Sequence, residues 1–211
     1  MRVGQKLLVC AISALAMIGA EISTGQVGMA LATPREQTII DTLGVDPTVT
    51  FSVSGASGET ITVEQSIGPR FTLDRRTRIT EIGAFITDCL LSREGCADTP
   101  AFIVQIRPEK DGLPDPNVVI ASFALSRNTD PFAFKYEFVR PHFRPLAAGT
   151  YFAIFATPRD ADAGALLGTA NSGAYVAGRI DLGFITPQGA ADAGLVPAAV
   201  RILGVPLGRP S

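Results

Sequence analysis

Tryptophan is absent from this sequence of 211 residues, and histidine occurs only once. Proton transfer in enzymes relies most often on histidine, so His142 is the first residue to test for a catalytic role. It follows Pro141 and lies between Arg140 and Arg144, which would disfavour a charged imidazole. The Gly-x-Ser-x-Gly motif of many serine hydrolases is also missing. We therefore interpret His142 as a turn residue and predict a non-catalytic protein.

The sequence also lacks an excess of charge of either sign. It has 18 lysine and arginine residues and 20 aspartate and glutamate residues, giving a formal net charge of −2. A nucleic-acid-binding domain is expected to have a basic surface and a high pI, so nucleic acid is not expected as a partner. The densest basic cluster, residues 75–78, is interpreted as a solvated turn between strands.

The start of the chain has the features of a secretory signal peptide. Two basic residues precede the apolar run 7–20, which is shorter than the ~20 residues of a membrane span. Ala30 and Ala32 supply the small residues that a signal peptidase reads. We predict a signal peptide over residues 1–32 and a mature protein that is secreted or held in the periplasm or cell envelope. The alternative is an uncleaved N-terminal anchor, which would be the only contact with the membrane.

Removal of residues 1–32 would leave 18 − 2 = 16 basic and 20 − 1 = 19 acidic residues, and only two of the three cysteines, Cys89 and Cys96. Exported proteins reach oxidising compartments, so we predict a disulfide between them that pins a surface loop and contributes about 2–3 kcal/mol. Two thiols alone make a poor zinc site, and their spacing does not fit a Cys-x-x-Cys redox motif. No metal and no cofactor are expected.

Four aromatic residues alternate along residues 131–140. In a β-strand, alternate side chains point to the same face, so one face of this stretch is strongly apolar. We predict a strand whose aromatic face is covered by a second layer, while Lys135 and Glu137 on its other face point to solvent. The aromatic residues are Phe132, Phe134, Tyr136 and Phe138.

Short stretches rich in β-branched and aromatic residues alternate with turn residues over most of the chain. Residues 48–54 and 60–65 flank a glycine-rich turn and predict a hairpin. Residues 33–47 predict an edge strand or an arm. After residue 158 the composition shifts to alanine, glycine and aspartate, and few stretches there are typical of strands. The other predicted strands are residues 70–73, 78–86, 102–107, 118–125, 151–156, 174–176 and 198–205.

These stretches predict an all-β fold, an antiparallel β-sandwich of jelly-roll-like form that follows the signal peptide. We expect the sandwich domain to span residues 48–206, with the arm at 33–47 before it and a short tail at 207–211 after it. Ala-rich pieces between residues 161 and 193 could form a helical turn, but scattered glycine and proline argue against a long helix.

Paired carboxylates offer a second route to catalysis, as in glycoside hydrolysis. Asp111 with Asp115, or Asp160 with Asp162, could form such a pair, and a secreted hydrolase using loop carboxylates is the alternative function. All four lie in turn-forming sequence, where solvated loop residues are the simpler interpretation. The segment 160–162 also lacks the residue order of a known calcium-binding loop.

The turns and strands together resemble bacterial secreted β-sandwich modules of the choice-of-anchor and PEP-CTERM-associated type. That group combines a strand ending in Phe, an I-T-x-I-G strand, a V-x-I strand with a G-x-P turn, and an L-x-x-G-T-Y turn into a buried strand. The resemblance spans residues 44–204 and implies an exported, non-catalytic module. The matching segments are residues 68–73, 79–83, 102–106, 112–114, 146–151 and 199–204.

Binding is the function class that remains. Sugar-binding surfaces use exposed aromatic rings with a polar tip, and with no tryptophan the candidates here are Tyr136, Tyr151 and Tyr175. We expect an extracellular or cell-envelope binding or structural role, with a carbohydrate or an envelope protein as ligand.

Overall fold

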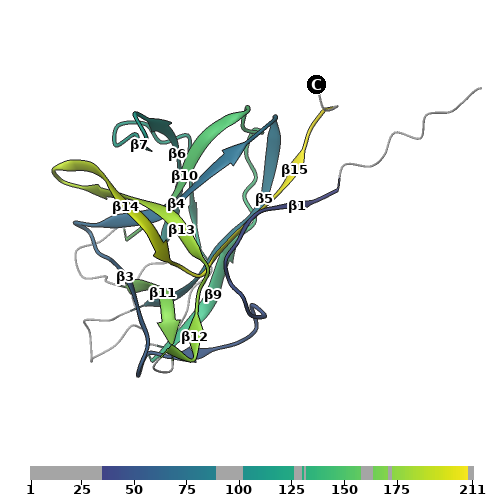
Figure 1. The fold of residues 1–211 in the computed structure, drawn as a ribbon. Helices are drawn as coiled ribbons and strands as arrows, with labels where there is room; N and C mark the ends of the chain where they lie inside the picture. Colours follow the sequence, from purple (N-terminus) through teal and green to yellow (C-terminus); the bar gives the residue numbers. More distant parts are fainter. Residues whose placement is uncertain are drawn as a thin grey trace, which may run out of the picture. The chain divides into compact units, whose positions relative to one another are not determined.

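The computed structural model describes residues 35–88, 102–125, 130, 132–157, 164–170 and 173–208, all within the unit Pro34–Ser211. Its elements are β-strands, arranged in two antiparallel sheets (Figure 1). The first sheet has eight strands: β1 (Gln37–Asp41), β2 (Phe51–Ser52), β3 (Ser57–Ile61), β5 (Thr77–Asp88), β9 (Ala133–Val139), β11 (Gly164–Ala170), β12 (Tyr175–Val176) and β15 (Val200–Pro206). The second has seven: β4 (Ser66–Leu73), β6 (Ile103–Lys110), β7 (Leu113–Pro114), β8 (Ala121–Ala124), β10 (Gly149–Ala156), β13 (Arg179–Thr186) and β14 (Gly189–Pro197).

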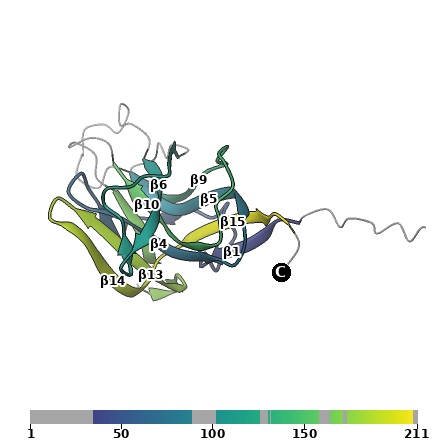
Figure 2. The ribbon, with the colours of Figure 1, turned by 90° about the horizontal axis from the view of Figure 1, so that it is seen from above.

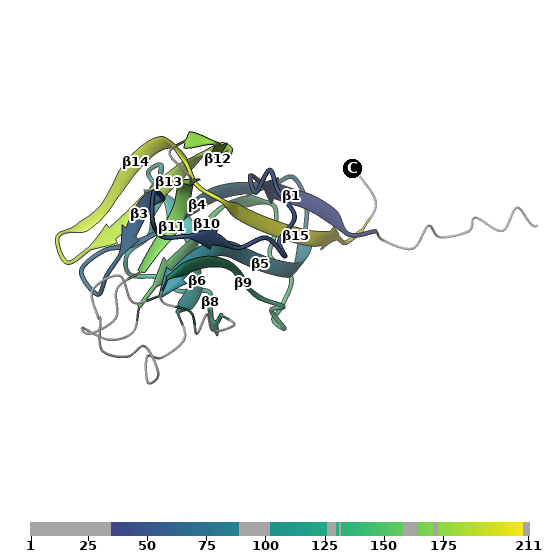
Figure 3. The same ribbon diagram turned by 90° about the horizontal axis from the view of Figure 1, so that it is seen from below.

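Strand β5 lies at the centre of the first sheet. It pairs antiparallel with β15, β11 and β9, and β1 continues the sheet beyond β15 (Figure 3). A central strand is buried on both faces, which explains why β5 carries apolar residues without strict alternation. The prediction of a central strand over residues 78–86 is confirmed.

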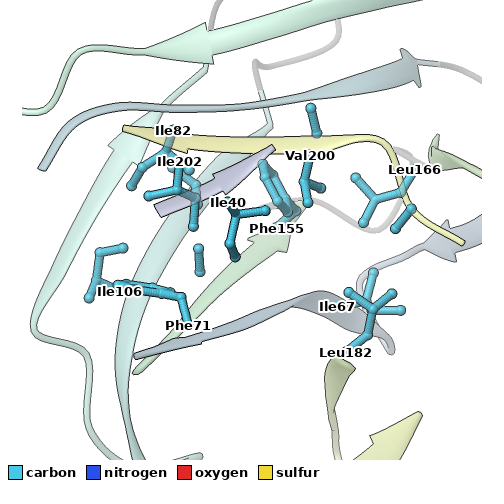
Figure 4. Packing of buried hydrophobic residues seen from close by; sticks show 14 of the residues in the cluster. Ile40, Ile67, Phe71, Ile82, Ile106, Phe155, Leu166, Leu182, Val200 and Ile202 are labelled. Atoms are coloured by element: carbon cyan, nitrogen blue, oxygen red, sulfur yellow. The ribbon is translucent and has the colours of Figure 1, made fainter. Parts of the chain in front are cut away.

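The main core lies between the inner faces of the two sheets. The first sheet contributes Ile82 and Ile202, and the second contributes Phe71, Ile106 and Phe155 (Figure 4). All five are buried. At about 25 cal/mol per Å² of apolar surface, such burial supplies most of the stability of a domain of this size. The prediction of an all-β fold is therefore confirmed at the level of two antiparallel sheets.

A second apolar cluster covers part of the outer face of the first sheet. Phe85 of β5, Phe134 of β9 and Leu167 of β11 meet Leu43 and Phe51, which belong to the chain between β1 and β3. The ring of Phe51 contacts Phe85 edge-on, with 5.4 Å between centroids. The aromatic residues of β9 thus face this second cluster and not the main core.

The exposure of two residues on or next to β9 differs from the sequence prediction. Glu137 was expected in solvent, but it is only 2% exposed, whereas Phe132, expected to be covered, is 72% exposed. Alternation along the strand directs Glu137 to the same side as Val139, which packs against the main core. Lys135 on that side is partly exposed and forms an ion pair with Asp130. The prediction of a solvated Glu137 is wrong because β9 has apolar groups on both sides.

The predicted hairpin of residues 48–65 does not form. Strand β2 pairs with β9, and β3 pairs with β11, so the two strands flanking the glycine turn have different partners. The prediction that few strands follow residue 158 is also wrong. Strands β11, β13 and β14 occupy much of that region, and β13 and β14 form a long hairpin (Figure 2).

The hairpin strand β14 contains a β-bulge. Leu182 of β13 lies opposite Gly194 and Gly183 lies opposite Asp192, so Ala193 is an extra residue in the ladder. Gly194 has a φ of 70°, and its N–H donates to the Asp192 carboxylate at 2.7 Å. The positive φ favours glycine at this position.

Several predicted features lie outside the described residues. These are the signal peptide, the Cys89–Cys96 disulfide, and the pair Asp160 and Asp162. Within the described part of the chain, no helix has the length and apolar character needed to cross a membrane.

Candidate anion-binding groove

Two basic segments that are distant in the sequence lie side by side. One is the turn from β4 into β5 together with the first residues of β5, and the other is the connection from β9 to β10. They are joined by Thr77 and Leu146, whose backbone N–H groups each donate to the other's carbonyl oxygen at 2.9 Å. This bridge fixes the start of β5 against the chain that leaves β9.

A groove with a volume of about 580 Å³ lies between these segments. Its polar lining consists of Arg78, Thr80, Arg140 and His142, and its apolar lining consists of Ile79, Pro141 and Phe143. The volume falls within the roughly 300–1,000 Å³ typical of ligand sites. Most of the exposed lining is apolar, and the charged side chains that the described residues bring to it, those of Arg78 and Arg140, are both cationic. The groove is thus suited to an anionic or hydrogen-bond-accepting ligand.

The apolar wall of the groove is anchored in the protein interior. Ile79 is buried and belongs to the main core, and the ring of Phe143 lies 5.3 Å from that of Phe123 on β8. His142 is exposed, and its Nδ1–H donates to the carbonyl oxygen of Arg140 at 3.0 Å. Because these groups are held by packing and by a local turn, the groove is formed without a ligand.

An aromatic ladder positions Arg140. Its guanidinium lies over the ring of Phe138, 5.4 Å from the centroid. Phe138 stacks on Tyr136 with an interplanar angle of 16°, and Tyr136 meets Phe85 edge-on at 5.8 Å. Contact of a cation with a ring face is worth about 0.5–1 kcal/mol at an exposed site. The ladder therefore connects the second apolar cluster to the edge of the groove.

Tyr136 is held in place by Gly83 beneath it and by Glu81 beside it. A Cβ on Gly83 would lie 2.5 Å from the ring of Tyr136 and 2.8 Å from the carbonyl oxygen of Glu137, so only glycine fits. The hydroxyl of Tyr136 donates to Oε1 of Glu81 at 2.8 Å. Burial, followed by this hydrogen bond, raises the pKa of Tyr136 far above its usual value.

The three tyrosines predicted as candidate ligand residues are not brought to one surface. The hydroxyl of Tyr151 donates to the carbonyl of Ala147 at 3.1 Å, and its ring packs against Phe71 in the main core. The ring of Tyr175 stacks on Phe51 at 4.5 Å, and its hydroxyl donates to the carbonyl of Leu43 at 2.6 Å. Burial raises the pKa of Tyr175 to about 12. Of the three, Tyr136 is the one connected to the groove.

Asp111 and Asp115, the described members of the predicted carboxylate pairs, take part in the local structure of their turn. Asp111 occupies a tight turn with a φ of 55°, and Asp115 accepts a hydrogen bond from the backbone N–H of Asn117. The guanidinium of Arg107 lies under this loop and donates to the carbonyl oxygens of Asp115 and Pro116, both at 2.9 Å. Burial lowers the pKa of Arg107. Among the described residues, no cluster of three or more His, Cys, Asp or Glu side chains could hold a metal ion.

The sequence interpretation missed the groove. The sequence analysis interprets the cluster 75–78 and His142 as turn residues; in the structure Arg78 lies in β5 and His142 in the β9–β10 connection, and the fold brings the two together. The sequence contains one indication of the groove: two basic stretches, 75–78 and 140–144, each lie next to a predicted strand. Comparison with known protein families and with curated proteins found no match for this chain.

Proposed function

We propose that this protein is an exported, non-catalytic binding module with a jelly-roll-like β-sandwich fold, and that it binds carbohydrate in the groove between β5 and the β9–β10 connection. The observation that carries the proposal is the groove itself, a preformed hollow with two arginines, a threonine and a histidine around an apolar wall. The predicted signal peptide over residues 1–32 would direct export and be removed in the process.

The lining favours a sugar over a protein surface. Arginine offers a planar fork of donors that matches carboxylates and vicinal oxygens, and the hydroxyl oxygen of Thr80 can accept a hydrogen bond. Phe143 and Pro141 provide apolar contacts of the kind that a sugar ring can cover. A protein partner would need a broad interface of about 800 Å² per side, whereas this site is a local hollow.

The proposed absence of catalysis is supported by the kind of groups present. Among the described residues, the groove lining has no carboxylate, and the hydroxyl of Thr80 donates to Glu36 at 2.5 Å. The resemblance to secreted choice-of-anchor modules implies an exported, non-catalytic module, in line with this proposal.

Binding of the purified exported protein to an array of neutral and acidic glycans tests this function. Thr80→Tyr would place a large side chain in the groove without changing the charge, so we expect it to abolish saturable binding. Val176→Tyr introduces the same side chain at an exposed site on β12, and this variant should bind normally. Equal binding by both variants, or release of sugar products during incubation, would contradict the proposal. Both variants are checked by circular dichroism.

A further inference from the structure

We infer that the groove is part of a longer basic surface and that its ligand is an acidic polysaccharide carrying carboxylate or sulfate groups along its length. This inference rests on the proposed function and specifies the class of ligand. The basic surface consists of Arg75, Arg76, Arg78, Arg140, His142 and Arg144.

The fold assembles this surface from two segments. Arg75 and Arg76 belong to the turn before β5, whereas Arg140 and Arg144 flank the chain that leaves β9. The backbone bridge between Thr77 and Leu146 holds the segments together, so the two sets of cations lie on neighbouring segments, and Arg78, Arg140 and His142 meet at the groove. The whole chain has a net charge of −2, and such a concentration of cations is therefore a local property of the fold.

The cations of this surface are available to a ligand. Arg76, Arg78, Arg140 and Arg144 are exposed. The three ion pairs found in the described part of the chain involve other cations, namely Arg70, Lys135 and Arg201. Interactions of exposed cations with a ligand are strongly screened by salt, which gives the surface a measurable signature.

Nearby acidic groups do not neutralise this surface. Asp74 is exposed in the same turn as Arg75 and Arg76. Glu36 accepts a hydrogen bond from Thr80, and Glu81 accepts one from Tyr136. Five arginines thus outnumber these three carboxylates, so the positive charges stay in excess.

The shape of the site favours a polymer over a lipid surface or a small anion. A flat layer of lipid headgroups would reach the exposed arginines but would not enter a hollow of about 580 Å³. A single small anion would use one or two guanidinium groups and leave the others unoccupied. A polysaccharide with repeated negative charges can place one sugar in the groove while its neighbours reach Arg76 and Arg144.

The experiment measures the affinity of the full exported chain for three immobilised polysaccharides of similar length: a polyuronate, a sulfated glycan and a neutral glucan. We expect binding to the acidic polymers, with weakening as salt rises. Arg78→Ala/Arg140→Ala should weaken binding at least about tenfold, which corresponds to ~1.4 kcal/mol. Arg76→Ala/Arg144→Ala should weaken it less, and Lys135→Ala, which removes a cation near the start of β9, should have no effect.

A charge-conserving variant separates geometry from charge. Arg78→Lys/Arg140→Lys keeps both charges but loses the planar donor fork, so we expect weakening of about threefold or more if carboxylates are bound in a bidentate manner. Thermal unfolding of each variant confirms that the fold is retained. Affinity equal to that of the unchanged protein in both the alanine and the lysine variants would overturn the inference.

Two further outcomes separate this inference from the proposed function. If the neutral glucan binds as tightly as the acidic polymers and Thr80→Tyr abolishes that binding, the groove binds sugar but the acidic ligand class is wrong. If vesicles containing phosphatidylglycerol bind more tightly than any polysaccharide, both proposals are wrong. If a monomeric uronate competes as strongly as the polymer, the inference that the ligand binds along an extended surface is wrong.

Discussion

The two faces of the first sheet have different chemistry and different roles. Its inner face, with Ile82 and Ile202, is aliphatic and buried against the second sheet. Its outer face is aromatic and only partly covered, since Phe85 is buried while Tyr136 and Phe138 are partly exposed. The inner face therefore mainly supplies stability. The outer face extends from the second apolar cluster to Arg140. Its stacked aromatic rings hold the Arg140 side chain in place at the edge of the groove.

The largest expected effect is on the inner face. Ile82→Ala removes a fully buried side chain at the centre of β5, and the loss of apolar contact together with the resulting cavity should lower the free energy of unfolding by about 3–5 kcal/mol. Urea denaturation measures this change. A loss below about 1 kcal/mol would show that the inner face is not the main source of stability.

The next effect concerns Gly83, where the outer face comes closest to β9. Gly83→Ala would force the ring of Tyr136 and the carbonyl of Glu137 away from the sheet, at an expected cost of about 1–3 kcal/mol. The double variant Gly83→Ala/Tyr136→Ala should be less destabilised than the sum of the single variants, because the ring that clashes has been removed. Additive losses in urea denaturation would contradict this packing.

A smaller effect is expected from Tyr136→Phe. This change keeps the aromatic ladder but removes the hydrogen bond to Glu81, which should cost about 1 kcal/mol. Because the ring still supports Phe138, ligand binding in the groove should be unchanged. Tyr136→Ala is the matched variant and should weaken binding by releasing Phe138 and Arg140. Equal effects of the two variants on binding would show that the ring does not position Arg140.

The smallest effect is the response of the outer face to alkaline pH. The pKa of Tyr175 is raised to about 12, so the folded state keeps the proton that the unfolded state loses near pH about 10. The stabilisation is fully present below pH about 10 and is lost as the pH rises through about 12. Tyr175 is only half-buried, so solvent screening reduces this loss, and we expect it to be smaller than the effects above. Tyr175→Phe should flatten the fall in unfolding free energy, measured by urea denaturation across this range.

The strands with strong side-chain patterns could be predicted from sequence. Alternation identified β6 and β9, and a continuous apolar run identified β10. Strand β11 was missed because Gly164 and Gly168 resemble strand breakers. In the structure a Cβ on Gly164 would lie 2.4 Å from the carbonyl oxygen of Thr87, so glycine is needed for the close approach of β11 and β5.

Pairing between distant segments could not be predicted. The glycine-rich turn before β3 does lie between two strands, as predicted. Local sequence does not tell whether such strands pair with each other or with other partners. The groove depends on the bridge between Thr77 and Leu146, which no local pattern encodes. Sequence reasoning therefore found the basic residues and their turns but not their convergence.

The bulge at Ala193 has a consequence for how copies of this protein behave toward one another. Strand β14 ends the strand order of the second sheet, and an unprotected strand there could pair with a strand of a second molecule. The extra residue interrupts the regular spacing of backbone donors and acceptors, and the exposed Asp192 adds a negative charge at the same place. A β-bulge that shapes one hairpin thereby also discourages sheet-to-sheet polymerisation at high concentration.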